Sequence, residues 1–246
     1  MKNYKNLYIN GCSFTAGHEL DDKYIWPNLL NKELNYNLIN QAKNGQSFES
    51  IVYNTVSHLS TLKPSETLVI IGITWPERYL VSAENFNVNI TPADLGKKKN
   101  DWGDKISTWR RISTPLTTDM LKMDDMYFKL NHKNIFKIIT SFQKYYETLV
   151  KYSSTLEYDQ KIKQINLLIL LQSFLKIHKF NYRFIGFDNE KILFGTQFDI
   201  KPYKKFDKSK YIFFNFRNEC KMDGTAHPTK ECCIKIKDKI IKNLND

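Results

Sequence analysis

LYINGCSFTAG, residues 7 to 17, is the stretch of sequence that decides the expected fold. Its first three residues are apolar, as in a buried β-strand, and Gly-Cys-Ser-Phe-Thr-Ala-Gly follows almost at once. Such a junction places the hydroxyl of Ser13 on a tight turn at the carboxyl end of a strand. Ligands of open α/β sheets bind at that end. Ser13 is therefore the first candidate functional residue.

The segments after this turn alternate between strand and helix patterns, which implies a parallel sheet with helices on both faces. Up to residue 72 we expect strands over 6–10, 37–40 and 67–72 and helices over 26–34 and 47–61. Further along we expect helices over 135–152 and 161–178, a strand over 181–187 and a last helix from about residue 229. The helix over 161–178 is expected to be buried, because residues 165–171 are apolar nearly all round. The predicted fold is a flavodoxin-like, three-layer α/β/α sandwich with a parallel sheet of order 2-1-3-4-5.

The predicted domain spans residues 1–246 and carries two insertions, at about 81–130 and 189–216. The first shows no clear period, and irregular stretches of this length are usually functional or disordered. Its tryptophans argue for order, so it is predicted to cover the site or to decorate the domain loosely. The second insertion is basic and aromatic.

Length and charge limit the classes of protein to which this chain can belong. The chain has 246 residues, 41% of them hydrophobic, which suits one large domain with a substantial core. Lysine and arginine number 37 against 26 acidic residues, so the formal charge is +11. This excess is typical of an anionic partner such as nucleic acid, or of solvated lysines. Because the basic residues are spread over the chain, solvated lysines are favoured.

The four cysteines form no CxxC pair and no zinc-binding spacing. Cys232 and Cys233 are adjacent, a poor disulfide framework, so reduced thiols in a cytoplasmic compartment are expected. The first residues lead to no apolar signal-peptide region. The longest apolar run, 167–171, is far shorter than the ~20 residues of a membrane span. We therefore expect no membrane partner.

DGTAHP, residues 223 to 228, supplies a base for the serine. Pro228 keeps His227 extended and suits the start of a helix, so His227 is expected at a loop-to-helix junction. An imidazole beside Ser13 can take its proton, and a carboxylate such as Asp223 can fix the tautomer of that imidazole. The alternatives are a helix-capping role for His227 and a turn role for Asp223.

Other serine and phosphate motifs fit poorly. The nucleophile elbow of α/β-hydrolases has the pattern Gly-x-Ser-x-Gly, whereas position 15 is threonine. Five residues separate Gly11 from Gly17 and His18 follows, so the turn is no phosphate-binding P-loop. A dinucleotide-binding GxGxxG pattern is absent from the sequence.

Four short blocks, in order, resemble those of the SGNH, or GDSL-like, hydrolases. They are residues 11–17, 40–45, 71–75 and 223–227. The resemblance implies a Ser-His-Asp triad of Ser13, His227 and Asp223 and an esterase or acetylesterase activity on O-acyl substrates such as O-acetylated sugars. It implies no metal and no cofactor.

The same resemblance implies an oxyanion hole formed by the N–H groups of Ser13 and Gly45 with the hydroxyl of Thr74. Trp75 and Arg78 follow the third expected strand and are candidate substrate-binding residues, with packing as the alternative.

Two departures from the family pattern stand out. Thr74 replaces the asparagine that the family uses as an oxyanion donor, and His227 follows Asp223 at an offset of four positions rather than three. A GCSFT-like first block with Gly-x-Thr-Trp in the third block resembles a divergent branch common in viral or environmental sequences.

A second hypothesis keeps the fold without efficient catalysis. The chain would then be a binding module for carbohydrate or nucleic acid, with its basic and aromatic insertions as the contact surface. The residues concerned are Trp102, Trp109, Arg110, Arg111 and the range 203–211.

Overall fold

Five parallel strands form the central sheet in a computed structural model that describes residues 4–18, 20–75, 79–83, 86–90, 156–187, 206–220 and 227–245. Along the sheet the order is β2-β1-β3-β6-β7, which is the predicted 2-1-3-4-5. The bounds are β1 (Asn6–Asn10), β2 (Asn37–Asn40), β3 (Thr67–Ile73), β6 (Asn181–Gly186) and β7 (Tyr211–Phe213). In β1, Leu7 pairs with Leu38 of β2 and with Leu68 of β3.

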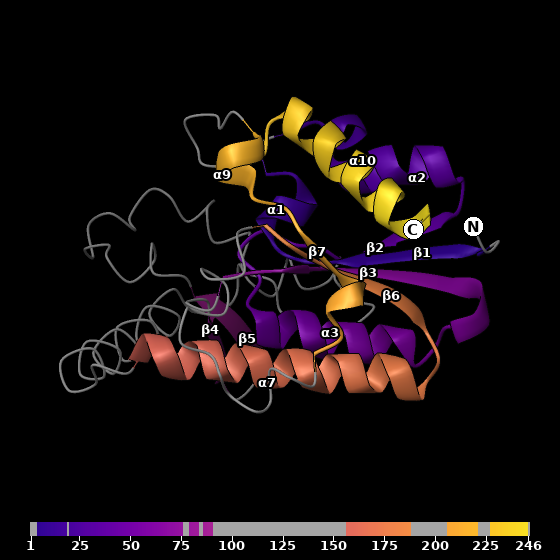
Figure 1. Ribbon diagram of the computed structural model, residues 1–246. Helices are drawn as coiled ribbons and strands as arrows, with labels where there is room; N and C mark the ends of the chain where they lie inside the picture. The colour runs from indigo at the N-terminus through magenta and orange to yellow at the C-terminus, as the bar shows by residue number, and fades with distance from the viewer. Residues whose placement is uncertain are drawn as a thin grey trace.

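Helices cover both faces of this sheet, so the three-layer prediction is confirmed (Figure 1). One face carries α2 (Trp26–Leu34) and α10 (Lys230–Asn245), which contact each other. The other face carries α3 (Phe48–Leu59) and α7 (Leu156–Ile177), which also contact each other. No helix among the described residues is both long and apolar enough to cross a bilayer.

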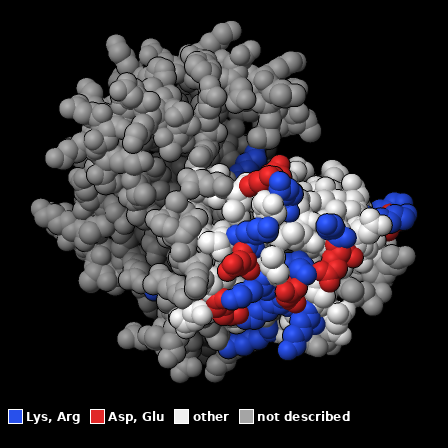
Figure 2. All heavy atoms as spheres, turned by 90° about the horizontal axis from the view of Figure 1, so that it is seen from above, with Lys and Arg blue, Asp and Glu red and all other residues white. Residues whose placement is uncertain are grey.

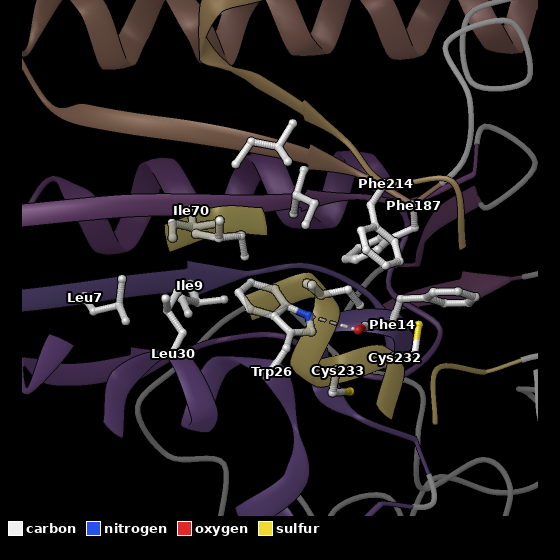
Figure 3. Packing of buried hydrophobic residues seen from close by; sticks show 14 of the residues in the cluster. Leu7, Ile9, Phe14, Trp26, Leu30, Ile70, Phe187, Phe214, Cys232 and Cys233 are labelled. Carbon is white, nitrogen blue, oxygen red and sulfur yellow. Dashed lines mark hydrogen bonds between the residues drawn. The ribbon is translucent and has the colours of Figure 1, made fainter. Parts of the chain in front are cut away.

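The alternation of side chains along each strand divides the core into two layers. Leu7 and Ile9 of β1 belong to the cluster under α2 and α10, whereas Tyr8 belongs to the cluster under α3 and α7. Figure 3 shows the first cluster, in which the indole of Trp26 lies beside the strand residues. Trp26 is fully buried, and its Nε1–H donates to the Phe14 carbonyl at 3.1 Å. This bond ties α2 to the turn that follows β1.

The short elements lie between these layers or beside them. They are α1 (Ser13–Ala16), α9 (Phe216–Glu219), the 3-10 turns η1 (Asp22–Tyr24), η2 (Pro64–Glu66) and η6 (Lys208–Lys210), and an antiparallel hairpin of β4 (Tyr79–Ala83) and β5 (Phe86–Ile90).

Both predicted insertions contain regular structure. The hairpin strand β5 lies inside the range 81–130, and β7 lies inside the range 189–216. The sequence did not locate β7 because three residues are too few to show a period. The rest of both ranges, and the predicted helix over 135–152, lie outside the described residues. The single-domain organisation stays a prediction.

The helix predicted over 161–178 is α7, but it is not buried on all sides. Its inner residues, such as Leu168 and Leu171, are fully buried, whereas Leu170 is 61% exposed. The nearly continuous apolar run therefore overstated the burial of this helix.

Candidate active site

Ser13 follows the carboxyl end of β1 and is the first residue of the short helix α1. The turn is closed by the N–H of Ala16, which donates to the Cys12 carbonyl at 2.9 Å, and by the N–H of Gly17, which donates to the Ser13 carbonyl at 3.0 Å. Gly17 ends the helix with φ 74°, a left-handed conformation that favours glycine. β1 is flanked by β2 and β3, so Ser13 lies where the chain switches sides of the sheet, the usual place for a ligand.

Asn10 anchors the junction between β1 and this turn, a role that the sequence reasoning missed. Its Oδ1 accepts the N–H of Gly11 at 2.8 Å. Its Nδ2 donates to the Ile51 carbonyl at 3.2 Å and to the Thr55 hydroxyl at 3.1 Å. Asn10 is fully buried, so these bonds satisfy its amide and tie the turn to α3. A polar residue that ends an apolar strand is the one signal for this role in the sequence.

Thr15 explains two of the glycines in the motifs. A Cβ at Gly11 or at Gly72 would meet the side chain of Thr15, and at Gly72 it would also meet Phe187. Gly11 belongs to the serine turn and Gly72 to β3, so the threonine packs between two segments that are far apart in sequence. The serine turn therefore packs closely against β3.

His227 comes to Ser13 from the opposite end of the chain. Its Nε2 lies 3.2 Å from the Ser13 Oγ. When the imidazole carries its proton on Nδ1, the Ser13 hydroxyl donates to Nε2 across this distance. His227 is half-buried and is followed by Pro228 and then by α10. The structure thus brings together the serine and the histidine that the sequence singled out.

The loop between β2 and α3 runs beside the serine turn. The N–H of Lys43 donates to the Gly11 carbonyl at 3.2 Å, and burial lowers the pKa of the Lys43 amine. Gly45 has φ 75°, so the turn needs glycine there for its backbone conformation. Ser47 then caps α3 by accepting the N–H of Ser50 at 3.3 Å.

Thr74 and Trp75 follow β3 at the same edge of the sheet. Thr74 is fully buried, and its hydroxyl has no hydrogen-bond partner among the described residues. Its carbonyl accepts Nε2–H of Gln164 from α7 at 3.0 Å. Trp75 packs edge-on against Phe14 with the ring centroids 4.6 Å apart. Asp223 and Arg78 lie outside the described residues.

The prediction of four reduced cysteines is wrong for one pair. Cys220 and Cys232 form a disulfide with their Cα atoms 5.3 Å apart, whereas Cys12 and Cys233 are free and buried. Burial raises the pKa of the Cys233 thiol to about 11. The bond joins the end of α9 to the first turn of α10 and so spans the segment that carries His227.

His18 is a second residue that the sequence reasoning missed, because it has no metal-like spacing to another histidine. Its ring centroid lies 4.5 Å from that of His227. Its position directly after Gly17 was the available signal. Among the described residues there is no group of three or more His, Cys, Asp or Glu side chains placed to hold a metal ion.

No protein-family model matches this chain, and no curated protein sequence matches it. Solved structures similar to it include TesA, with 12% identity, 97% of each chain covered and a TM-score of 0.49. The psychrotrophic esterase EstA from Pseudoalteromonas sp. has 11% identity, with 98% of this chain and 97% of EstA covered and a TM-score of 0.49. A putative lipolytic protein of the G-D-S-L family from Desulfitobacterium hafniense has 8% identity, with 98% and 99% covered and a TM-score of 0.47.

Proposed function

We propose that this chain is a serine esterase of the SGNH type that hydrolyses an O-acyl substrate, such as an O-acetylated sugar. The observation that carries the proposal is the 3.2 Å approach of His227 Nε2 to Ser13 Oγ across 214 residues of sequence. Nucleophile and base within hydrogen-bond reach are the signature of an activated serine. The turn that holds Ser13 buries Phe14 and Thr15, and the helix that begins after His227 buries Cys233 and Ile236.

In the proposed reaction, the Ser13 hydroxyl attacks the ester carbonyl while His227 Nε2 takes its proton. The imidazolium then gives that proton to the leaving alkoxide, and an acyl group remains on Ser13. Water repeats the sequence with His227 as base and releases the carboxylic acid. Asp223 is the proposed third member, which would hold the His227 proton on Nδ1.

The proposed oxyanion donors are the N–H groups of Ser13 and Gly45 and the hydroxyl of Thr74. The Thr74 hydroxyl supports this assignment because it is buried without a hydrogen-bond partner among the described residues. Other buried side chains, Thr15 among them, share this state, so the place of Thr74 directly after β3 is what favours it as a donor. Trp75 and Arg78 are proposed to contact the substrate.

The test is the intact mass after treatment with a fluorophosphonate, which reacts with activated serines. We expect one adduct on the wild type, none on Ser13→Ala, and one on the control Ser60→Ala, whose exposed side chain follows α3. A folded wild type without an adduct would overturn the proposal. Acetylated sugars and short esters then define the substrate, and we expect Ser13→Ala to lower kcat by ~10⁴-fold or more.

Thr74 can be tested with a matched pair of variants. Thr74→Val keeps the shape and removes the hydroxyl, so the loss of one oxyanion donor is expected to lower kcat by ~10²–10³-fold. Thr74→Ser keeps the hydroxyl and should retain most of the activity. Equal kcat values for the two variants would remove Thr74 from the oxyanion hole.

The described residues offer little support for the binding-module hypothesis. Tyr211, at the end of its proposed surface, is buried in β7. The face over α10 mixes lysines with acidic side chains (Figure 2). Two of these lysines are paired, Lys237 with Glu33 at 2.8 Å and Lys239 with Glu219 at 2.9 Å. Salt-dependent binding of RNA or DNA by a protein without a fluorophosphonate adduct would restore this hypothesis.

A further inference from the structure

His18 contacts both residues of the proposed catalytic pair. Its ring packs against that of His227 in a tilted arrangement, with the centroids 4.5 Å apart and the planes inclined by 59°. Its backbone N–H donates to the Ser13 carbonyl at 3.2 Å. Its place at the end of the serine turn therefore links the two segments that supply the nucleophile and the base.

The His18 side chain is itself held in place. It is half-buried, and its Nδ1 lies 3.4 Å from the Asn44 Nδ2, in the loop that also carries Gly45. In this arrangement the Asn44 amide donates and the Nδ1 of His18 accepts, so the proton of a neutral His18 lies on Nε2. The His18 imidazole thus contacts three segments of the site, namely the serine turn, the Gly45 loop and the His227 segment.

A general base works only while its nitrogen stays within hydrogen-bond reach of the hydroxyl. The His227 ring has two ring neighbours among the described residues, Phe14 with centroids 5.5 Å apart and His18 at 4.5 Å. Side chains locked by packing hold a catalytic geometry better than free ones. The closer of these two neighbours is His18.

We propose that His18 is a positioning residue, whose ring packs on the imidazole of His227 and keeps its Nε2 directed at the Ser13 Oγ. This inference rests on the proposed function of Ser13 and His227. It assigns His18 no proton transfer, because the contact that carries it is between rings. An aromatic ring of similar size should therefore replace it.

The test is the second-order rate constant for labelling of Ser13 by the fluorophosphonate, which needs no knowledge of the substrate. Loss of the ring in His18→Ala is expected to slow labelling by ~10–100-fold, the range for a catalytic group displaced by up to about 1 Å. His18→Phe keeps a ring against His227 and should restore the rate to within a few-fold of the wild type.

His178→Ala is the matched control. His178 also packs on an aromatic ring, Phe174, at 4.5 Å, but it precedes β6 and lies at the opposite end of the strands from Ser13. We expect this variant to label at the wild-type rate. The Tm of each variant is measured in parallel. Should His18→Ala fail to fold, His18→Gln, which keeps a polar end for Asn44 and lacks the ring, takes its place.

Two results would overturn the inference while leaving the proposed function intact. One is a folded His18→Ala, or His18→Gln in its place, that labels at the wild-type rate. The other is a His18→Phe that labels as slowly as the variant without a ring. A wild type that does not label at all would instead overturn the proposed function, and the role of His18 with it.

Discussion

Reduction of the Cys220–Cys232 disulfide should destabilise the protein by an amount that follows from the length of the loop it closes. The two cysteines are 12 residues apart. In the chain-entropy model a cross-link over a loop of this length lowers the entropy of the unfolded chain enough to raise the free energy of unfolding by about 3 kcal/mol at 25 °C. That is a large share of the ~5–15 kcal/mol that stabilises a typical domain.

The assay is urea unfolding of the wild type, followed by tryptophan fluorescence, with and without a phosphine reductant. We expect the free energy of unfolding to fall by about 3 kcal/mol on reduction. In thermal unfolding of the same two samples, the Tm should fall by roughly 6–12 °C for a chain of this size. The same side chains are present in both samples, so the difference reports the bond alone. The Cys220→Ala/Cys232→Ala double variant is the control, and its transition should not respond to the reductant.

Alkylation of the denatured protein counts the thiols independently. Without reductant we expect two modified cysteines, Cys12 and Cys233, and with reductant all four. Four modified cysteines without reductant would show that the bond does not form. If alkylation shows that one sample is oxidised and the other reduced, and their unfolding curves are nevertheless equal, the loop-length argument itself is refuted.

Three further outcomes follow from the packing around the site. Gly72→Ala should lower the free energy of unfolding by ~1–3 kcal/mol in urea titrations, because its Cβ would meet the side chain of Thr15. Trp26→Phe should cost ~1–3 kcal/mol in the same assay, because the buried Phe14 carbonyl loses its 3.1 Å donor. Cys233 should resist iodoacetamide in the native protein at pH 8 but react once the protein is unfolded in urea, because it is buried and its burial raises the pKa of the thiol to about 11; mass spectrometry would show the difference.

The sequence predicted most of the described elements because their signals are local. β1 and β2 have the predicted bounds, β3 and β6 end within one residue of prediction, and α2 matches its predicted range. Long apolar runs and helical spacing depend on which residues are neighbours in the chain. β7 was not predicted, because its three residues are recognisable as a strand only by their pairing with β6.

The approach of His227 to Ser13 was also predictable, for a topological reason. Parallel strands present their carboxyl ends at one edge of the sheet, so a serine that follows the first strand and a histidine that precedes the last helix are expected to meet there. The positions of Asn10 and His18 along the chain gave a signal, but not their roles, because these depend on contacts with α3 and with the His227 segment.

The amino-acid sequence by itself determined the alternation of strands and helices and the candidate serine and histidine, since periodicity and short motifs are encoded by neighbouring residues. Only the tertiary structure decided that Cys220 pairs with Cys232, that Thr15 fills the space between Gly11 and Gly72, and that His18 packs on His227. Each of these contacts joins segments whose separation is set by how the layers pack. That packing depends on the whole core, which no local pattern records.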